Sequence, residues 1–446
     1  MPDTAVTSLV RVAEQVRGGH MGVPQPSSID QIVIVNDFAT TAGGATAIAL
    51  SAAELYQQQG YKVTFISGDG PSERLRALGI EHVALNAPAL LKLPFRKAIA
   101  QGFHHGAAAR AVSEWIARHD TPGTAYHLHN WSQILSPAIF SALRPVEGRL
   151  VVTCHDFFNI CPNGGFSHFG DAAVCQAQPM SLQCLASNCD RRSYAQKIWR
   201  TGRHVNLNVQ ARFARSKATF TFLHEAMRQK FVDCGFAAPD LVTIPNPAHA
   251  WTDRRIEAER NRGLLFVGRI ARDKGADIAI RAAKDAGQKI TLVGSGELGR
   301  MPEESDGDVE FAGWCDREEI AAIASRARAL IVPSRILEPF GLVLVEAAMS
   351  GLPVIVASHA LLARDLVDMG CGVAFGMGRS AGPGSPEPGR VVARLATDDD
   401  LVRRMSHAGF DGARRLCSDP VEWISAFIAI FERKIEAFRS AGGVST

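Results

Sequence analysis

The sequence lacks long hydrophobic runs. Its apolar stretches, such as residues 32–35 and 342–345, are short, whereas a helix that crosses a bilayer needs about 20 apolar residues. Residues 1–28 also contain no apolar core of signal-peptide kind. We therefore expect a cytoplasmic protein with residues 1–28 as a flexible leader.

Cysteine pairs at metal-binding spacing are also missing. None of the nine cysteines belongs to a C-x-x-C pair, which disfavours common zinc modules, and a large chain without a signal peptide disfavours a secreted disulfide framework. Four cysteines nevertheless cluster: Cys161, Cys175, Cys184 and Cys189. Independent thiols in an irregular loop are the favoured interpretation, and a structural metal or a disulfide is the alternative.

Length and composition indicate a globular protein of two domains. The chain has 446 residues, 46% of them hydrophobic and 21% charged. This length is too great for one ordinary core, so two domains of roughly 200 residues each are expected.

Net charge is +3 but unevenly distributed. Residues 190–217 contain eight Lys or Arg and one Asp, which gives this segment +7 and leaves −4 for the rest. The excess suggests an anionic partner such as a lipid surface, a diphosphate-bearing acceptor or nucleic acid. The alternative is a solvated helix face. The candidate contact residues are Arg191, Arg192, Lys197, Arg200 and Arg203.

Strand-like and helix-like runs alternate along the chain, and the pattern restarts after the polar segment 250–263, a candidate linker. The alternation predicts an α/β protein with two doubly wound parallel sheets. The expected domains are 29–250 and 251–438, followed by a tail at 439–446. Segment 376–390 is expected to be a surface loop, and 419–438 a terminal helix that packs back on the first domain.

Polar residues follow several of the predicted strands. They include Asn36 and Asp37, His155 and Asp156, and Gly268 and Arg269. Ligands of doubly wound sheets bind beyond the carboxyl ends of the strands. We therefore expect these residues to converge on one cleft between two facing sheets.

The segment EPFGLVLVE, residues 338–346, has a carboxylate at each end of an apolar run. If a helix reached back to Glu338, Glu338 and Glu346 would lie about 12 Å apart. That separation is too long for a shared metal ion or for the paired acids of a retaining hydrolase. It matches a nucleoside diphosphate sugar, whose diphosphate would meet the free N–H groups of Phe340, Gly341 and Leu342.

Two further patterns suit a diphosphate. Arg269 and Lys274 follow a predicted strand and could stabilise negative charge on a leaving diphosphate. Gly43 and Gly44 lie between the first strand and the first helix, where glycine lets the backbone approach a phosphate. A surface ion pair and a plain tight turn are the alternatives.

The order of AGGA (42–45), TCHD (153–156), FVGRIARDKG (266–275), VGSGEL (293–298), VEFAGW (309–314) and EPFGLVLVEAAMSGLPVIVAS (338–358) resembles the nucleotide-sugar glycosyltransferases of family 4. These are retaining enzymes of the GT-B fold, with two Rossmann-like domains facing a central cleft. The resemblance covers residues 30 to about 435. It implies an N-terminal acceptor domain and a C-terminal donor domain.

The resemblance also implies roles for individual residues. Glu338 would contact the donor sugar hydroxyls, Glu346 the ribose, and Arg269 and Lys274 the diphosphate. His155 would lie beside the transferred sugar. The implied catalytic set is His155, Glu338, Arg269 and Lys274. The implied donor-binding set is Gly43, Gly44, Gly268, Arg269, Lys274, Gly294, Trp314, Glu338, Phe340, Gly341, Leu342 and Glu346.

The expected function is retaining, metal-independent transfer of a hexose from a nucleoside diphosphate sugar, as co-substrate, to a saccharide or lipid-linked acceptor in polysaccharide or glycoconjugate synthesis. No cofactor and no nucleic acid is expected. Peripheral contact with the inner face of the cell membrane is expected from the basic segment. A same-fold sugar-phosphate synthase or phosphorylase, and a non-catalytic sugar-nucleotide-binding protein, remain alternatives. Base, sugar, acceptor, linkage and oligomeric state stay open.

Two segments depart from the family pattern, and two others imitate different kinds of binding site. Segment 358–367 lacks the family's Gly-Gly turn and carries Asp365. The cysteine-containing insert 157–190 resembles one in polysaccharide-building relatives, and we expect it to shape acceptor choice. GSGELG (294–299) imitates a dinucleotide site but lies in the second domain without a matching acidic strand end. DGD (306–308) precedes its strand, so no catalytic metal is predicted.

Overall fold

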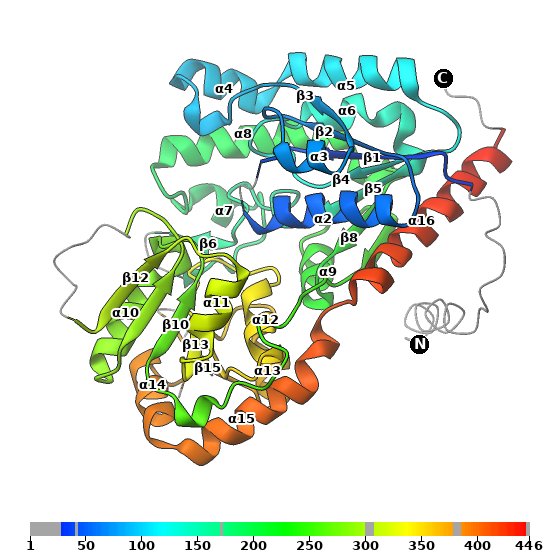
Figure 1. The fold of residues 1–446 in the computed structure, drawn as a ribbon. Coiled ribbons are helices and arrows are strands. Elements are labelled where there is room, and N and C mark those ends of the chain that lie inside the picture. Colours follow the sequence, from blue (N-terminus) through cyan, green and yellow to red (C-terminus); the bar gives the residue numbers. More distant parts are fainter. Residues whose placement is uncertain (1–27, 41–42, 170–172, 299–306, 378–384, 443–446) are drawn as a thin grey trace, which may run out of the picture.

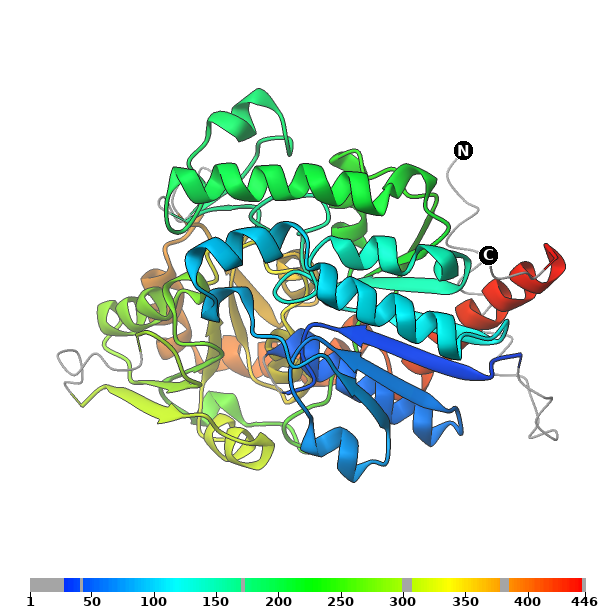
Figure 2. The ribbon, with the colours of Figure 1, turned by 90° about the horizontal axis from the view of Figure 1, so that it is seen from above.

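The computed structural model describes residues 28–40, 43–169, 173–298, 307–377 and 385–442. The expected leader, apart from Ser28, lies outside this part. Two parallel sheets confirm the predicted α/β class, and Figure 1 and Figure 2 show the two domains side by side. Within the described residues, every helix is too short or too polar to cross a bilayer.

The first sheet has seven strands in the order β3-β2-β1-β4-β5-β8-β9. All printed pairings within it are parallel. Its central strands are buried along their whole length, as expected of a parallel sheet covered on both faces. The strands are β1 (Gln31–Asn36), β2 (Val63–Ser67), β3 (Glu81–Ala84), β4 (Thr124–Leu128), β5 (Leu150–Cys154), β8 (Thr219–Phe222) and β9 (Asp240–Thr243).

Helices connect and cover these strands. A two-stranded antiparallel hairpin, β6 (Ser167–His168) with β7 (Ala173–Val174), lies inside the insert. The helices are α2 (Gly44–Gln58), α3 (Glu73–Ala77), α4 (Phe95–Phe103), α5 (Gly106–His119), α6 (Ala138–Ala142), α7 (Leu182–Ala186), α8 (Tyr194–Ala211) and α9 (Glu225–Asp233).

The second sheet has six parallel strands in the order β12-β11-β10-β13-β14-β15. They are β10 (Leu264–Val267), β11 (Ile290–Val293), β12 (Val309–Gly313), β13 (Ala329–Val332), β14 (Val354–Ala357) and β15 (Gly372–Phe375). The helices of this half are α10 (Ala276–Asp285), α11 (Arg317–Ala324), α12 (Leu342–Met349), α13 (Ala363–Asp368), α14 (Pro388–Thr397) and α15 (Asp399–Gly412).

The last helix, α16 (Pro420–Ser440), returns to the first domain (Figure 1). Its buried face includes Trp423, Phe427 and Phe431, which belong to the same apolar cluster as residues of β1 and α2. The Phe427 ring lies 4.6 Å from the His127 ring of β4, centroid to centroid. The terminal segment therefore crosses between the two domains.

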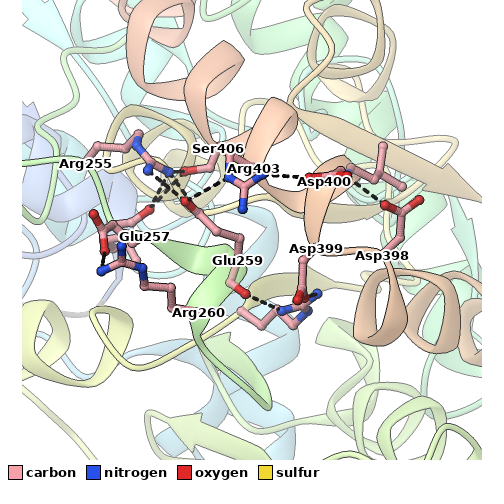
Figure 3. A network of polar contacts seen from close by, with 12 residues as sticks. Arg255, Glu257, Glu259, Arg260, Asp398, Asp399, Asp400, Arg403 and Ser406 are labelled. Atoms are coloured by element: carbon pink, nitrogen blue, oxygen red, sulfur yellow. Dashed lines mark hydrogen bonds and ion pairs between the residues drawn. The ribbon is translucent and has the colours of Figure 1, made fainter.

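The polar segment 250–263 is held against α15 by a charged network (Figure 3). Arg255 forms an ion pair with Glu259 at 2.9 Å and donates to the Ser406 hydroxyl at 2.7 Å. Arg403 lies 3.6 Å from the same Glu259 carboxylate. Arg328, which is buried, donates to the Glu259 carbonyl at 3.0 Å. The segment is thus a packed connection with its own partners.

One conditional inference does not apply, and one expected boundary was wrong. Helix α12 begins at Leu342, so it does not reach back to Glu338, and the 12 Å separation inferred from a continuous helix does not apply. Gly341 before it has a φ of 74°, which interrupts the helix. Helix α14 begins at Pro388, inside the expected loop 376–390; residues 378–384 of that loop lie outside the described part.

Candidate active site

In the second domain, the loops after strands β10 and β11 contact each other through two glycines. Gly268 follows β10 with a φ of 150°, and Gly294 follows β11 with a φ of 132°. A Cβ on Gly294 would lie 2.0 Å from the Gly268 carbonyl oxygen, which no side chain could tolerate. The two loops therefore meet backbone to backbone, next to Arg269.

Lys274 and Glu338 form the central pair of the site. The Lys274 ammonium lies 2.8 Å and 3.1 Å from the two Glu338 carboxylate oxygens, and the Ser334 hydroxyl donates to Glu338 at 2.9 Å. Gly275 makes the approach possible, because a Cβ there would lie 1.9 Å from the Pro333 carbonyl oxygen.

Glu338 stays ionised although it is almost fully enclosed. Burial raises the pKa of the Glu338 carboxyl, but the Lys274 ammonium and the Ser334 hydroxyl outweigh burial and leave the pKa below its usual value. The site therefore presents a fixed carboxylate, a group that accepts hydrogen bonds from sugar hydroxyls.

Asp273 orients Arg269. Its carboxylate lies 2.5 Å from the Arg269 guanidinium and is 7% exposed, whereas the Arg269 side chain is 53% exposed. One nitrogen of the Arg269 guanidinium is thus held by Asp273, while much of the side chain is open to solvent. That arrangement suits a cation that meets a mobile anionic ligand.

Two helix N-termini lie close to each other across the domain boundary. Helix α12 starts after Gly341 and helix α2 after Gly43, and neither has a side-chain cap. A Cβ on Gly44 would lie 3.9 Å from the Leu342 side chain, so the two ends are close. Unpaired N–H groups and both helix dipoles favour an anion here.

Glu346 lies one turn into α12. Burial raises the pKa of the Glu346 carboxyl to about 7, against the lowering effects of Arg317 and the Trp251 side chain. Trp314 follows β12 and is 76% exposed. Phe340 is buried at the start of the helix.

The segment that departs from the family pattern still contacts the site. His359 lies 2.7 Å from the Ser334 carbonyl, and the Leu361 N–H donates to the Glu338 carbonyl at 3.3 Å. Asp365 lies 3.4 Å from His224 of the first domain. Segment 358–367 thus supports the Glu338 loop from behind and meets the other domain.

His155 and Asp156 lie on the first-domain side, at the end of β5. His155 Nε2 lies 2.8 Å from His129 Nδ1. Burial lowers the pKa of His155 to about 4, so its ring is neutral at pH 7. Burial raises the pKa of Asp156 to about 6. These side chains and Trp131 line a small cavity.

Asp37, also at a strand end, is held by backbone hydrogen bonds inside the first domain. Its carboxylate accepts hydrogen bonds from the N–H groups of Gln133, Ile134 and Leu135 at 2.7–2.9 Å. It is fully buried. Asp37 therefore fixes the loop after β4, which carries Trp131 into the cavity beside His155.

The basic segment is largely turned inward. Lys197 and Arg203 on α8 are buried, and Arg200 forms an ion pair with Asp190 at 2.9 Å. Arg191 forms ion pairs within the protein, and only Arg192 of the five candidates is exposed without such an ion pair among the described residues. The set of five is therefore not a shared cationic surface, because hydrogen bonds inside the fold occupy most of it.

The four clustered cysteines are all buried and free. Lys197 Nζ donates to the Sγ atoms of Cys184 and Cys189 at 3.3 Å and 3.4 Å. Across the residues that the structure describes, no group of three or more His, Cys, Asp or Glu side chains has a geometry that could hold a metal ion.

Sequence patterns missed several residues of the site. Asp273, Ser334 and His359 support Arg269 and Glu338, and His129 supports His155. Asp273 and Ser334 were visible as neighbours of motif residues, one before Lys274 and four before Glu338. His129 gave a signal only as a polar residue just beyond β4.

Comparison with known proteins identifies the class of protein. The family model described as "Glycosyl transferases group 1" matches residues 250–379, and the one described as "Glycosyl transferase 4-like domain" matches residues 43–247. Together the matches cover most of the chain, both of its domains and the site just described. The chain therefore belongs to the glycosyltransferases of the GT-B fold, with a 4-like domain in its first half and a group 1 domain in its second half.

Curated relatives match over a shorter range. An uncharacterised 41.2 kDa protein in the cps region of Klebsiella pneumoniae is 35% identical over 108 residues, 24% of this chain and 30% of that protein. The chain thus spans about a third of the length of the curated relatives that it matches first.

Solved structures share the fold over almost the whole chain. Sucrose-phosphate synthase from Thermosynechococcus elongatus has a TM-score of 0.64 at 16% identity, over 91% of this chain and 99% of its own. HepE of Anabaena, solved in complex with UDP, has a TM-score of 0.59 at 16% identity, over 92% and 100%. At such identities the likeness concerns the fold.

Proposed function

We propose that this protein is a retaining transferase of family 4 type. It moves a hexose from a nucleoside diphosphate sugar to a saccharide or lipid-linked acceptor. The observation that carries the proposal is the Lys274–Glu338 ion pair. Glu338 lies four residues before Leu342, where helix α12 begins without a side-chain cap. A fixed carboxylate beside a cation and free N–H groups suits the sugar hydroxyls and the diphosphate of one ligand.

The donor would lie between the neighbouring starts of α2 and α12. In this arrangement the diphosphate meets the N–H groups near Gly44 and Leu342, together with Arg269 and Lys274. The Glu338 carboxylate accepts from the sugar hydroxyls, and Glu346 accepts from the ribose. These contacts are of the kinds that helix N-termini and charged side chains make with phosphates and hydroxyls.

Transfer would proceed on one face of the sugar. The bond between the anomeric carbon and the departing phosphate oxygen breaks, while the acceptor oxygen forms a bond on the same side. The departing phosphate takes the acceptor proton. Arg269, Lys274 and the two helix starts stabilise the charge that develops on the phosphate. Side-chain cations counter this negative charge in the proposal, and no metal ion or other cofactor has a step in it.

His155 would border the sugar from the first domain. Its ring is neutral at pH 7 because burial lowers its pKa to about 4. A neutral imidazole can donate one hydrogen bond and accept another, and the His129 contact occupies Nε2. Its Nδ1 is then the atom that faces a substrate hydroxyl.

Thermal shift with UDP, GDP, ADP and NAD tests the donor class. Stabilisation by at least one of the three nucleoside diphosphates is expected, and stabilisation by NAD alone would overturn the assignment. A donor screen with saccharide and lipid-linked acceptors then identifies the sugar. Inorganic phosphate and sugar phosphates belong in the same screen, because turnover with them alone would indicate a phosphorylase or a sugar-phosphate synthase.

Glu338→Ala tests the site itself. Turnover is expected to fall by at least about 1,000-fold, since a contact made to the reacting sugar is lost. Glu318→Ala, an exposed carboxylate on α11, is the matched control and should retain activity. Full activity of Glu338→Ala would show that the site is wrong. A folded Glu338→Ala protein that binds nucleotide without turnover would separate the enzyme from a binding protein.

We further propose that the protein works in the cytoplasm and contacts an anionic membrane face in polysaccharide or glycoconjugate synthesis. The support is an exposed apolar stripe on α8, with Ile198 59%, Val205 50% and Val209 63% exposed. The exposed cations Arg212 and Arg215 follow it. We propose this surface as the membrane contact in place of the basic residues of the same segment that point into the protein.

Sedimentation with liposomes checks the membrane contact. Binding is expected to require anionic lipid and to weaken with salt, because surface attraction is screened within about 10 Å at 0.1 M salt. Ile198→Ser with Val209→Ser should reduce binding. Equal binding to neutral liposomes would contradict the proposal.

A further inference from the structure

The cysteine-containing insert, residues 157–190, belongs to the first domain but touches the second domain beside Glu338. The Gly165 carbonyl accepts from the Leu337 N–H at 3.0 Å, and the Ser167 hydroxyl donates to the Arg335 carbonyl at 2.7 Å. Ser167 is fully buried. Because residues 335–337 lead directly into Glu338, these two bonds hold the loop that places the Glu338 carboxylate.

A second contact follows at the end of the insert. The Arg191 guanidinium lies 3.2 Å from the Asp273 carboxylate and 3.3 Å from that of Glu297. The other Asp273 oxygen lies 2.5 Å from Arg269, and the Asp273 carbonyl accepts from the Arg335 N–H at 2.9 Å. Asp273 is thus shared between a cation of the first domain and a cation of the donor site.

The insert is braced from behind by Asn163. Its side-chain oxygen accepts from the Gly165 N–H at 2.9 Å and from the Cys161 thiol at 3.2 Å. Its side-chain nitrogen donates to the Ser167 carbonyl at 2.9 Å and to Cys189 Sγ at 3.3 Å. The same residue therefore fixes both docking positions of the insert and connects them to the cysteines.

Lys197 continues this brace into the body of the first domain. The side chain is 1% exposed and donates to Cys184 and Cys189 from helix α8. Burial lowers the pKa of Lys197, but the neighbouring thiols of Cys189 and Cys184 outweigh burial and raise it. A path of polar contacts thus runs from α8 through the cysteines and Asn163 to the Glu338 loop. Figure 1 shows α7 and β6 in this place between the domains.

We propose that the insert is a positioning element of the donor site. Through Ser167, and through Arg191 directly after the insert, it holds the 335–337 loop and Asp273, and so sets where Glu338 and Arg269 meet the nucleotide sugar. This inference rests on the proposed function. It differs from the expectation that the insert shapes acceptor choice, because its contacts go to the donor domain.

Arg191→Ala in the full chain tests the proposal, with Arg192→Ala as the matched control. Arg192 is exposed, and its side chain has no role in the contacts above. The probe is the nucleoside diphosphate that most stabilises the unmodified protein, and the measurement is its Kd by calorimetry. Arg191→Ala should weaken binding about 3- to 10-fold, as expected for one partly exposed charge-assisted contact. Arg192→Ala should stay within about twofold.

Two further variants separate positioning from general stability. Arg191→Lys keeps the charge and should recover part of the affinity, whereas Ser167→Ala should weaken nucleotide binding with an unchanged KM for the acceptor. The melting temperature of each variant without nucleotide is measured alongside. A loss of affinity in Arg191→Ala and Ser167→Ala at unchanged melting temperature supports the proposal.

Three outcomes overturn it. Equal nucleotide affinity of Arg191→Ala and Arg192→Ala is one, and a change confined to the KM for the acceptor is the second. The third is that no nucleoside diphosphate binds to the unmodified protein, which overturns the proposed function as well. The first two leave the proposed function standing, so the two failures are distinguishable.

Discussion

Two sets of basic side chains, chemically alike, lie in opposite environments. Arg269 and Lys274 are 53% and 28% exposed and pair with carboxylates at the carboxyl ends of the second sheet. Lys197 and Arg203 on α8 are buried, and their partners are thiols and backbone carbonyls. The first set keeps donor capacity open toward solvent, while the second set uses its capacity inside the fold.

The difference shows why local charge density is a poor guide to a binding surface. The segment 190–217 has the greater excess of positive charge, but its buried cations cannot reach an external anion without leaving their partners. The donor set has only two cations. Position at a strand end, with an uncapped helix start nearby, makes those two cations available to a ligand.

The largest expected effect is on the exposed set. Lys274→Ala should reduce turnover of the nucleotide sugar by about 100- to 1,000-fold, because a cation that stabilises the departing phosphate is removed. Turnover assays of the variant measure this loss, and circular dichroism verifies that it is folded. Lys289→Ala, an exposed lysine before β11, is the control. Equal activity of the two variants would erase the distinction between the sets.

The next effect concerns the buried set. Arg203→Met should lower the free energy of unfolding by about 3 kcal/mol, because the Gly102 and Ser132 carbonyls lose their buried donor. Urea denaturation measures the loss. Nucleotide affinity of the folded variant should stay within about twofold. A stable Arg203→Met protein with weakened nucleotide binding would invert the comparison.

A smaller effect is expected from pH at the donor site. Since burial raises the pKa of Glu346 to about 7, the free protein loses the Glu346 carboxylate as pH falls from 8 to 6. Nucleotide affinity should then fall by up to about tenfold, because a protonated carboxyl accepts ribose hydroxyls less well. Calorimetry across this range measures it. Glu346→Gln should bind weakly at every pH with a flat profile; an unchanged slope would assign the titration to another group.

The smallest effect is expected far from the site, in the network of Figure 3. The Arg255 hydrogen bond is the main cause that lowers the pKa of Glu259 to about 2, below its ordinary value of 4.5. The ionised Glu259 carboxylate therefore stabilises the folded protein fully above about pH 4.5, and this stabilisation is lost as pH falls through about 2. Glu259→Gln should lower the free energy of unfolding by about 1 kcal/mol at pH 7. Denaturation near pH 2 should show a smaller difference, and an equal loss at both pH values would contradict the assignment.

Much of the fold follows from local pattern. Apolar runs bounded by polar or glycine residues predicted most strands of both sheets, since a strand inside a covered parallel sheet is buried on both faces and needs a nearly continuous apolar run. The short strands β3, β6, β7 and β15 escaped this reasoning. Strands β6 and β7 have two residues each, too few for a distinct period, whereas β3 and β15 have four residues and are only partly buried.

The candidate site divides in a similar way. Gly268, Lys274 and Glu338 were predicted because each belongs to a motif whose chemistry is local. The start of α12 at Leu342 was not predicted, because nothing in the sequence indicates the positive φ of Gly341. The partners Asp273, Ser334 and His359 were missed because they act only through neighbours distant in the chain.

The sequence by itself determined the class of fold, the order of the strands along the chain and the residues that carry charge at strand ends. These depend on side-chain polarity and period, which are read locally. Only the tertiary structure decided which cations form hydrogen bonds inside the protein and which remain open to solvent. It also decided that the cysteine-containing insert contacts the donor domain. The reason is that hydrogen-bond partners such as Ser167 and Arg335, or Lys197 and Cys189, are chosen by proximity in space, and proximity depends on how the whole chain packs.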